Sequence, residues 1–333
     1  MKIMVAGSGG WGTALALVLL KNGNDVTLWS YCREESDSLA ATKKNPFLPN
    51  VDIPSEMQFT ADCALASQME MIVFATPSFA VRSTAKTFAP YLKDDVVLVS
   101  VTKGIEDDTG YRMSELIEQE TGKKVVALSG PSHAEEVARG IPTGVVVACA
   151  DKDLAEKVQS VFACDRLRVY TCPDAVGVEL GAAHKNVIAL CAGVCDGMGY
   201  GDNTKALLMT RGLAEVARLG MALGAKRETF AGLAGVGDLI VTCTSMHSRN
   251  RRAGMLIGQG KRVDEAMKEV GAVVEGYYAA KAAFLLAQKV GVEMPITQAA
   301  YEVLYCGKDP IYELNRLMTR QSHCEVEDAQ WAR

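Results

Sequence analysis

The sequence predicts an α/β protein in two parts: a doubly wound parallel β-sheet in the N-terminal half, followed by an all-helical C-terminal domain. Three observations support this. Short apolar runs alternate with helical stretches up to residue 172, the alternation stops at Pro173, and the remainder shows mainly helical patterns. Alternation of strand and helix is typical of a parallel sheet covered on both faces. The 333 residues suffice for two domains, which we place at 1–172 and 173–333.

The predicted strands are short apolar runs separated by helical stretches. The first helical stretch, Trp11–Asn22, ends at Gly23, a residue favoured just after a helix. We expect strands at Lys2–Ala6, Asp25–Trp29, Met71–Ala75, Val96–Val101, Val125–Ser129 and Gly144–Ala148, with a further edge strand at Leu167–Tyr170.

The second part contains almost no strand-like run. Pro173 interrupts the preceding element, and Asp174 is a residue that can cap the first helix. We expect the polar tail after Met318 to be loosely ordered. Helical patterns occur at 175–197, 203–223, 227–233, 250–258, 263–269, 275–290 and 296–306.

The most apolar long segment is Ala175–Cys195. It contains Glu179, His184 and Lys185 and is rich in glycine and alanine, which makes it a poor membrane span. We therefore expect a buried helix and no stable insertion into a membrane.

Composition and charge exclude several classes of protein. The net charge of −5 offers no general attraction to nucleic acid or to an anionic membrane. The ten cysteines form no CxxC pair and no ligand-like spacing with the four histidines, so we expect reduced thiols and no metal site. The chain starts directly with a strand and shows no signal-peptide pattern, which predicts a cytoplasmic location.

A glycine-rich turn, Gly7-Ser8-Gly9-Gly10-Trp11-Gly12, supplies the spacing GxGxxG between the first strand and the first helix. Gly7 permits a tight turn, Gly9 lets the backbone approach a pyrophosphate, and Gly12 lets the helix pack close to the strand. The N-terminus of the helix then faces the phosphates. This context predicts a Rossmann-type dinucleotide site; the alternative is a turn with a structural role alone.

The end of the second predicted strand bears on which dinucleotide binds. An NAD-selective site usually has an Asp or Glu there for the ribose 2′-hydroxyl. Asp25 lies too early, whereas Ser30 and Tyr31 bring no negative charge. Arg33 can meet a 2′-phosphate, or can simply begin the next helix in solvent. The sequence therefore favours NADP(H), with dual use of NAD(H) and NADP(H) as the alternative.

Two further segments follow predicted strands at the edge where open parallel sheets bind their ligands. Lys103 is a candidate ligand-binding cation, with an ordinary surface lysine as the alternative. Gly130 and Ser132 can offer backbone and hydroxyl donors to a polar or anionic substrate. Ser132 can also cap the next helix in a capping box with Glu135, and the two roles are compatible.

Lys185 and Asp238 are charged residues in apolar surroundings. A lysine enclosed in an apolar helix loses hydration, which favours its neutral form and lets it exchange protons near neutral pH; alternatively, it reaches solvent from the edge of the helix. Asp238 ends a glycine-rich turn and is costly to bury unless it pairs with a cation, for which Lys185 is the candidate. We expect the neighbouring His184 to be a packing residue.

A basic segment, Ser248-Arg249-Asn250-Arg251-Arg252, lies just before a predicted helix. Arginine and asparagine side chains beside the free N–H groups of a helix form a phosphate site. The alternative is a solvated basic surface.

These segments together resemble the bacterial-type NAD(P)-dependent glycerol-3-phosphate dehydrogenase family over essentially the whole chain. An ordered set of motifs at similar separations is far more specific than any one motif. The motifs are GSGGWGTALA (7–16), VTKGIE (101–106), GPSHAEEVA (130–138), HKNVIAL (184–190), AGVGDLIVTCTS (234–245), SRNRR (248–252), VVEGYYAAK (273–281) and VEMPIT (292–297).

The resemblance implies roles for the candidate residues. Lys185 corresponds to the proton donor and acceptor of the family. Two positions depart from the family pattern: Gly10 stands where serine is frequent, and Tyr31 where histidine or arginine is commoner. The implied substrate residues are Lys103, Gly130, Ser132, Lys185, Asp238, Ser248, Arg249 and Asn250, and the implied cofactor residues are Gly7, Gly9, Gly10, Trp11, Gly12, Tyr31, Lys103, Ala134, Arg249, Val273 and Glu275.

The resemblance also implies a reaction. NAD(P)H would give a hydride to C2 of dihydroxyacetone phosphate while Lys185 protonates the developing alkoxide and Arg249 holds the phosphate. The product, sn-glycerol 3-phosphate, would enter phospholipid synthesis, and a homodimer is the expectation from the family. Two alternatives stay open: a related two-domain dehydrogenase for a 3-hydroxy acid or a sugar acid, and a non-catalytic dinucleotide-binding sensor.

Overall fold

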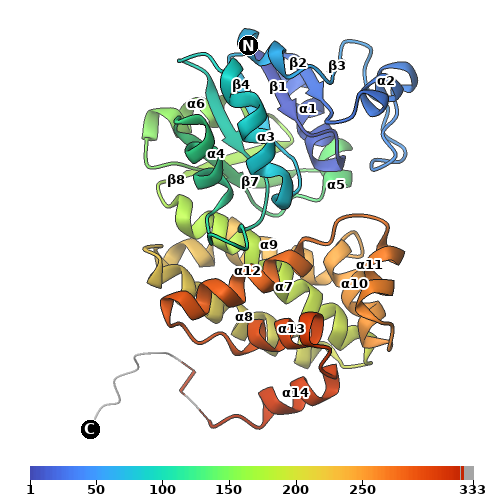
Figure 1. Cartoon of the computed structure of the whole chain (residues 1–333), viewed down its shortest axis with the longest axis vertical. Coiled ribbons are helices and arrows are strands. Elements are labelled where there is room, and N and C mark those ends of the chain that lie inside the picture. The colour runs from blue at the N-terminus through green and yellow to red at the C-terminus, as the bar shows by residue number, and fades with distance from the viewer. Residues whose placement is uncertain (323, 326–333) are drawn as a thin grey trace.

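The computed structural model describes residues 1–322 and 324–325. Most of the tail that we expect to be loosely ordered, from residue 326 on, lies outside the described residues. Figure 1 shows a sheet with its helices at one end of the long axis and a helical region at the other. The last strand ends at Cys172 and the first helix of the helical region begins at Ala175. The predicted fold class, a doubly wound sheet followed by helices, is confirmed.

Every predicted strand is present, and all lie in one eight-stranded sheet of order β3-β2-β1-β4-β5-β6-β7-β8. The strands are β1 (Lys2–Ala6), β2 (Asp25–Trp29), β3 (Gln58–Thr60), β4 (Met71–Phe74), β5 (Val97–Ser100), β6 (Val125–Ser129), β7 (Thr143–Ala148) and β8 (Leu167–Cys172).

The sheet differs from the prediction in two respects. The edge strand β3 was not predicted, because its three residues contain a single large apolar side chain, Phe59, and form no apolar run. The sheet is also not entirely parallel, since β7 runs antiparallel to β6 and β8 runs parallel to β7. The connection from β6 to β7 contains only the five-residue helix α5 (Ala134–Ala138). The alternation of strands and helices in the sequence does not indicate that the strand direction changes here.

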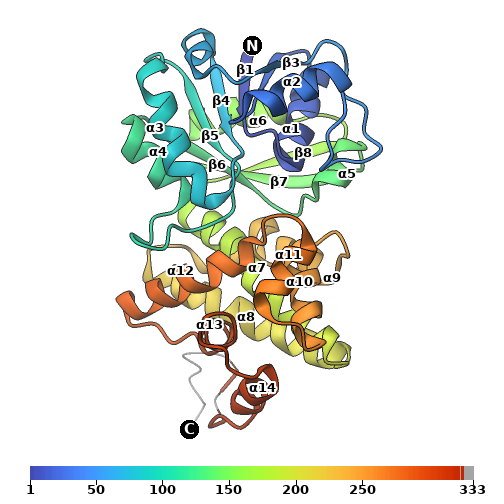
Figure 2. The same cartoon turned by 45° about the vertical axis from the view of Figure 1, so that its right-hand side comes forward.

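Helices cover both faces of the sheet, as Figure 2 shows. On one face, α1 (Gly10–Lys21) and α6 (Lys152–Phe162) contribute Leu15, Leu19, Val158 and Phe162 to a buried core with the strands. On the other face, α3 (Val81–Phe88) and α4 (Met113–Thr121) pack against the strands in a second core. The remaining helical elements of this part are α2 (Arg33–Thr42) and the short 3₁₀ turns η1 (Cys63–Gln68), η2 (Ser78–Ala80) and η3 (Ala89–Tyr91).

The helical region surrounds one central helix, α7. The predicted helix at 227–233 is instead the 3₁₀ turn η4 (Arg227–Ala231), and two helices, α9 (Asp238–Thr244) and α14 (Pro310–Met318), were not predicted. The elements are α7 (Ala175–Gly197), α8 (Asp202–Ala222), η5 (Leu233–Gly237), α9 (Asp238–Thr244), α10 (Arg249–Gly258), α11 (Val263–Val270), α12 (Glu275–Val290), α13 (Pro295–Cys306) and α14 (Pro310–Met318).

Helix α7 is long and apolar enough to cross a membrane by length and composition, but 89% of its most apolar window is buried inside the protein. Asp174 caps the helix by accepting a hydrogen bond from the Gly177 N–H at 2.9 Å, as expected. The structure therefore confirms a buried core helix.

Glycines bring α7 and α10 into backbone contact. A Cβ atom on Gly193 or Gly197 of α7 would lie 2.0 or 2.2 Å from a carbonyl oxygen of α10. In return, a Cβ atom on Gly254 or Gly258 of α10 would lie 2.0 or 2.2 Å from a carbonyl oxygen of α7. Because each helix carries its two glycines four residues apart, on one face, the backbones of the two helices interlock at close range.

Candidate active site at the carboxyl edge of the sheet

The glycine loop has the geometry that its spacing predicts. Gly7 has a φ of +132° and lies so close to Ala75 that a Cβ atom would be 2.7 Å from the Ala75 backbone. A Cβ atom on Gly12 would lie 1.9 Å from the Gly7 oxygen, whereas nothing lies within 4 Å of one on Gly9. No side chain caps α1. The loop therefore leaves the N-terminus of α1 open to an anionic group, and the residues fit a dinucleotide.

The other predicted cofactor residues on the sheet side lie around this loop. Gly10 faces Ala134 and the backbone of Phe47, so a Cβ atom there would be 3.2 Å from the Phe47 oxygen. The indole nitrogen of Trp11 is buried and has no hydrogen-bond partner among the described residues. Tyr31 is 89% exposed beyond the end of β2.

Three charged side chains from distant parts of the chain meet in one cluster. Asp238, the first residue of α9, is completely buried. Lys185 of α7 donates a hydrogen bond to Oδ1 of Asp238 at 2.6 Å, and Lys103, which follows β5, donates to Oδ2 at 2.7 Å. The predicted Lys185–Asp238 pair is therefore present, and Lys103 joins it from the sheet.

Burial controls the protonation of this cluster. Removal from water lowers the pKa of Lys185 to about 8, although the neighbouring Asp238 acts in the opposite direction. Burial also opposes ionisation of Asp238, but Lys103 and Lys185 hold the pKa of that carboxyl below its ordinary value. The cluster thus combines a fixed carboxylate with an amine that can lose its proton close to neutral pH. Burial lowers the pKa of His184 to about 4, in keeping with a packing role.

Thr242 also contacts the amine, and the sequence analysis does not identify it. Its hydroxyl accepts a hydrogen bond from Lys185 at 2.6 Å and donates one to the Asp238 carbonyl oxygen at 2.6 Å. The segment before Asp238 was predicted as an irregular turn, but η5 is a π-helical turn that continues directly into α9. In the resulting helix Thr242 follows Asp238 by four residues, so both face Lys185.

Gly130 and Ser132 lie next to Lys103. The Gly130 carbonyl oxygen accepts hydrogen bonds from Lys103 and from the Ser132 hydroxyl, each at 2.9 Å. Gly130 therefore helps to hold Lys103 in position, and binding of a substrate by Gly130 and Ser132 stays a prediction. The expected capping box with Glu135 is absent, because α5 begins at Ala134 and its N-cap, His133, makes no side-chain cap.

The basic segment forms the first turn of α10, not the loop before it. Ser248 caps this helix and accepts a hydrogen bond from the Arg251 N–H at 3.2 Å. Asn250 is buried and bonded to Asn186 and to the Gly276 N–H, and Arg251 is paired with Asp196. Among the described residues, the exposed Arg249 has no hydrogen-bond or ion-pair partner. Arg249 is thus the residue of the predicted phosphate set that remains available to a ligand.

A contact at the start of α12 links the helical region to the sheet. Glu275 accepts hydrogen bonds from the Ser78 N–H at 3.1 Å and from the Ser78 hydroxyl at 2.5 Å. Burial raises the pKa of Glu275, and the positive charge of Arg249 counteracts the rise. Val273 lies half-buried in the segment before this helix. Ser78, which follows β4, has no signal in the sequence that would have identified it.

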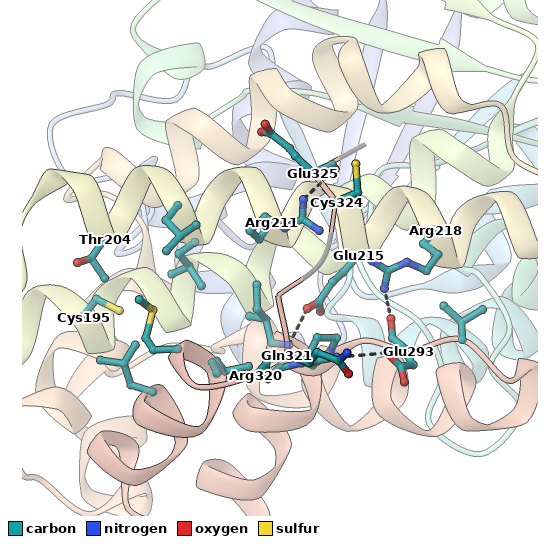
Figure 3. Close-up of a pocket in the computed structure, with 18 of the residues that line it drawn as sticks. Cys195, Thr204, Arg211, Glu215, Arg218, Glu293, Arg320, Gln321, Cys324 and Glu325 are labelled. Carbon is teal, nitrogen blue, oxygen red and sulfur yellow. Dashed lines mark hydrogen bonds and ion pairs between the residues drawn. The ribbon is translucent and has the colours of Figure 1, made fainter. Parts of the chain in front are cut away.

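A pocket of about 800 Å³ lies elsewhere, between α8, α13 and α14 (Figure 3). Its lining includes Arg211, Glu215 and Arg320 but none of the predicted site residues. Glu215 binds the N–H of Ile296 at 2.7 Å and so holds the start of α13, and burial raises its pKa to about 7. The cavity thus lies apart from the buried ionic cluster and the glycine loop, which together form the candidate active site.

A dinucleotide held by the glycine loop would lie at the carboxyl edge of the sheet, and Lys103 joins Asp238 and Lys185 to that same edge. A Rossmann-type sheet followed by a helical region, with this cluster between them, defines a nicotinamide-dependent oxidoreductase. Sequence models for the N-terminus and the C-terminus of NAD-dependent glycerol-3-phosphate dehydrogenase match residues 2–155 and 174–315. The chain belongs to the NAD-dependent glycerol-3-phosphate dehydrogenase family.

Individual relatives agree with this assignment. A protein of Pelotomaculum thermopropionicum named glycerol-3-phosphate dehydrogenase [NAD(P)+] is 52% identical, with 98% of this chain and 95% of that protein covered. One of the same name from Fusobacterium nucleatum is 49% identical, with 98% and 99% covered. The crystal structure of glycerol-3-phosphate dehydrogenase from Coxiella burnetii has a TM-score of 0.93 and 36% identity over 96% of this chain and 99% of that one. A ketopantoate reductase from Ralstonia eutropha, at 14% identity and a TM-score of 0.62, shares the fold alone.

We predict that Thr242→Val lowers the pKa that governs proton transfer by Lys185. Reduction of a ketone requires the protonated amine, so the wild-type rate should be full below about pH 8 and fall as the pH rises through that value. Loss of the hydroxyl removes an acceptor of the charged form and should move this fall to lower pH by up to about one unit. The pH dependence of kcat measures the shift.

Thr244→Val is the matched control, because Thr244 lies on the same helix, is exposed, and its hydroxyl bonds to the Ile240 carbonyl oxygen and not to Lys185. The control should reproduce the wild-type profile. Identical profiles for all three proteins would show that Thr242 does not act on the amine.

Proposed function

We propose that this chain interconverts dihydroxyacetone phosphate and sn-glycerol 3-phosphate with NAD(P)(H). The observation that supports the proposal most strongly is the buried Lys185 amine, held 2.6 Å from Asp238 at the edge of a dinucleotide-binding sheet. A bound nicotinamide cofactor supplies the hydride in one direction and accepts it in the other. The protein must then supply or remove a proton and bind the phosphate.

Lys185 carries the proton. As the carbonyl group at C2 becomes an alkoxide, the ammonium group donates a proton to its oxygen; in the oxidative direction the neutral amine takes the proton of the C2 hydroxyl. Two of the three N–H groups of Lys185 bind Asp238 and Thr242, which leaves the third for the substrate. A pKa of about 8 suits this exchange in both directions.

Lys103 supplies a positive charge and transfers no proton in the proposed reaction. It binds Asp238 and the Gly130 carbonyl oxygen, which fix its position beside the amine of Lys185. Two lysines and one aspartate carry a net charge of +1 when Lys185 is protonated. This charge favours binding of an anionic substrate and stabilises the alkoxide that develops during hydride transfer.

Arg249 binds the phosphate in this proposal. Its guanidinium group is unpaired among the described residues, and it stands at the first position of α10, where backbone N–H groups attract anions. Ser248 and Asn250 support this site by holding the first turn of α10 in place, through the cap and through the bonds to Asn186 and Gly276.

The direct test is steady-state oxidation of NADH and NADPH by the pure protein. We expect turnover with dihydroxyacetone phosphate and, because a carboxylate does not match the phosphate site, little with 3-oxo acids or sugar acids. Turnover of a 3-oxo acid with none of dihydroxyacetone phosphate would support a related dehydrogenase instead. Cofactor binding without turnover of any substrate would support a sensor.

We predict that Lys185→Met lowers kcat by roughly 10² to 10⁴, the usual effect of losing a positioned acid. Cofactor affinity should stay nearly unchanged, since the Lys185 amine bonds to Asp238 and Thr242 and to no residue of the glycine loop. Stopped-flow measurement of NADPH oxidation gives the rate, and titration of the protein with NADPH gives the affinity. Near-normal turnover would contradict the role of Lys185.

Substitution of Arg249 tests the phosphate site. Arg249→Ala should weaken binding of dihydroxyacetone phosphate by on the order of 2 kcal/mol or more, because a charge-assisted contact is lost, and should affect unphosphorylated dihydroxyacetone far less. Arg252→Ala, three residues further along the same helix and also exposed, is the control. Equal losses for both substrates would refute phosphate binding by Arg249.

We also propose that the enzyme acts in the cytoplasm, as a homodimer, and that its product enters phospholipid synthesis. The burial of α7 and the free state of the described cysteines support the first point. The second is an expectation from the family, which sedimentation analysis tests. The third follows from the chemistry of the proposed product.

A further inference from the structure

A carboxylate lies against the glycine loop, although the end of β2 provides none. Glu35 of α2 accepts a hydrogen bond from the hydroxyl of Ser8, the second residue of the loop, at 2.8 Å between Oε1 and Oγ. Ser8 is only 5% exposed. Glu35 lies in the first turn of α2, beyond the strand end where an acidic residue for the ribose is expected.

The fold puts Glu35 where a dinucleotide presents its adenosine ribose. β1 and β2 are parallel neighbours with Ala6 opposite Trp29, and the Gly7 N–H donates to the Trp29 carbonyl oxygen at 3.0 Å. The segments that follow these two strands thus lie side by side at one edge of the sheet. In Rossmann-type domains the pyrophosphate occupies the first of these segments and the ribose lies toward the second.

The partner of Glu35 is held firmly. The Asn45 amide donates to the Ser8 carbonyl oxygen at 2.8 Å and to the Thr13 hydroxyl at 2.7 Å, and these three residues are buried. The second carboxylate oxygen of Glu35 receives no hydrogen bond from the described residues. One oxygen therefore anchors the side chain to a fixed loop, while the other is available as an acceptor for a ligand hydroxyl.

We propose that Glu35 recognises the adenosine ribose and opposes a 2′-phosphate there. The inference rests on the NAD(P)(H) use described above. A carboxylate accepts a hydrogen bond from the 2′-hydroxyl of NADH, whereas the 2′-phosphate of NADPH brings a like charge close to it. The first turn of α2, rather than the end of β2, then sets the cofactor preference.

Arg33, in the same turn of α2, acts in the opposite sense. Its guanidinium group is exposed and has no ion-pair partner among the described residues, so it attracts a 2′-phosphate. Opposing effects of Arg33 and Glu35 account for a chain that takes both cofactors, and they replace the preference for NADP(H) that Arg33 alone suggests. The preference is therefore adjustable in either direction by a single substitution.

The test is calorimetric titration of the pure protein with NADH and with NADPH, without substrate. Glu35→Gln keeps an acceptor for Ser8 but removes the charge, so it should lower the ratio of Kd for NADPH to Kd for NADH by on the order of tenfold. Glu34→Gln is the matched control, because Glu34 binds the exposed Cys32 thiol and not the loop. The control should keep the wild-type ratio.

Arg33→Gln should raise the same ratio. Glu35→Asp, whose shorter side chain withdraws the charge from the loop, should lower the ratio less than Glu35→Gln and provides a second measurement if the latter does not fold. Equal weakening of both cofactors in the Glu35 variants, or a ratio no different from that of the Glu34 control, would overturn the proposal. Because no substrate is present, failure to turn over dihydroxyacetone phosphate would leave this result unaffected.

Discussion

A single buried carboxylate holds the reactive site together. Asp238 has no exposure to solvent, and a charge in that position is tolerated only when cations and donors surround it. Lys185 supplies one cation from the central helix, and Lys103 supplies the other from the sheet. The requirement to neutralise one aspartate thus ties the helical region to the carboxyl edge of the sheet, and it places there the amine that we propose as the proton donor.

Much of the fold could be predicted because apolar runs and glycines impose strong local constraints. Buried strands such as β1 and β4 need continuous apolar side chains, and Gly7 and Gly12 are required by the tight approach of β1 to α1. Strand β3 could not be predicted, because its three residues are partly exposed and form no apolar run. The antiparallel direction of β7 could not be predicted either, because tertiary packing decides the course of the connection before it.

Some residues of the candidate site could likewise be predicted from the sequence, and others could not. Lys185 and Asp238 were predictable as a pair because each is costly to bury alone. Thr242, Ser78 and Glu35 are polar residues of ordinary kinds, and only their neighbours in space give them a role. The same holds for the bonds of the buried Asn250 to Asn186 and to the Gly276 N–H, which its position at the start of a helix does not indicate.

The interlocked glycines of α7 and α10 have a consequence for alignment in the reaction. Lys185 and Arg249 are carried by these two helices, so close backbone contact sets the spacing between the proposed proton donor and the proposed phosphate ligand. The glycine loop belongs to the sheet instead. In the proposed mechanism, the placement of this one pair of helices relative to the sheet would then decide whether substrate and nicotinamide meet.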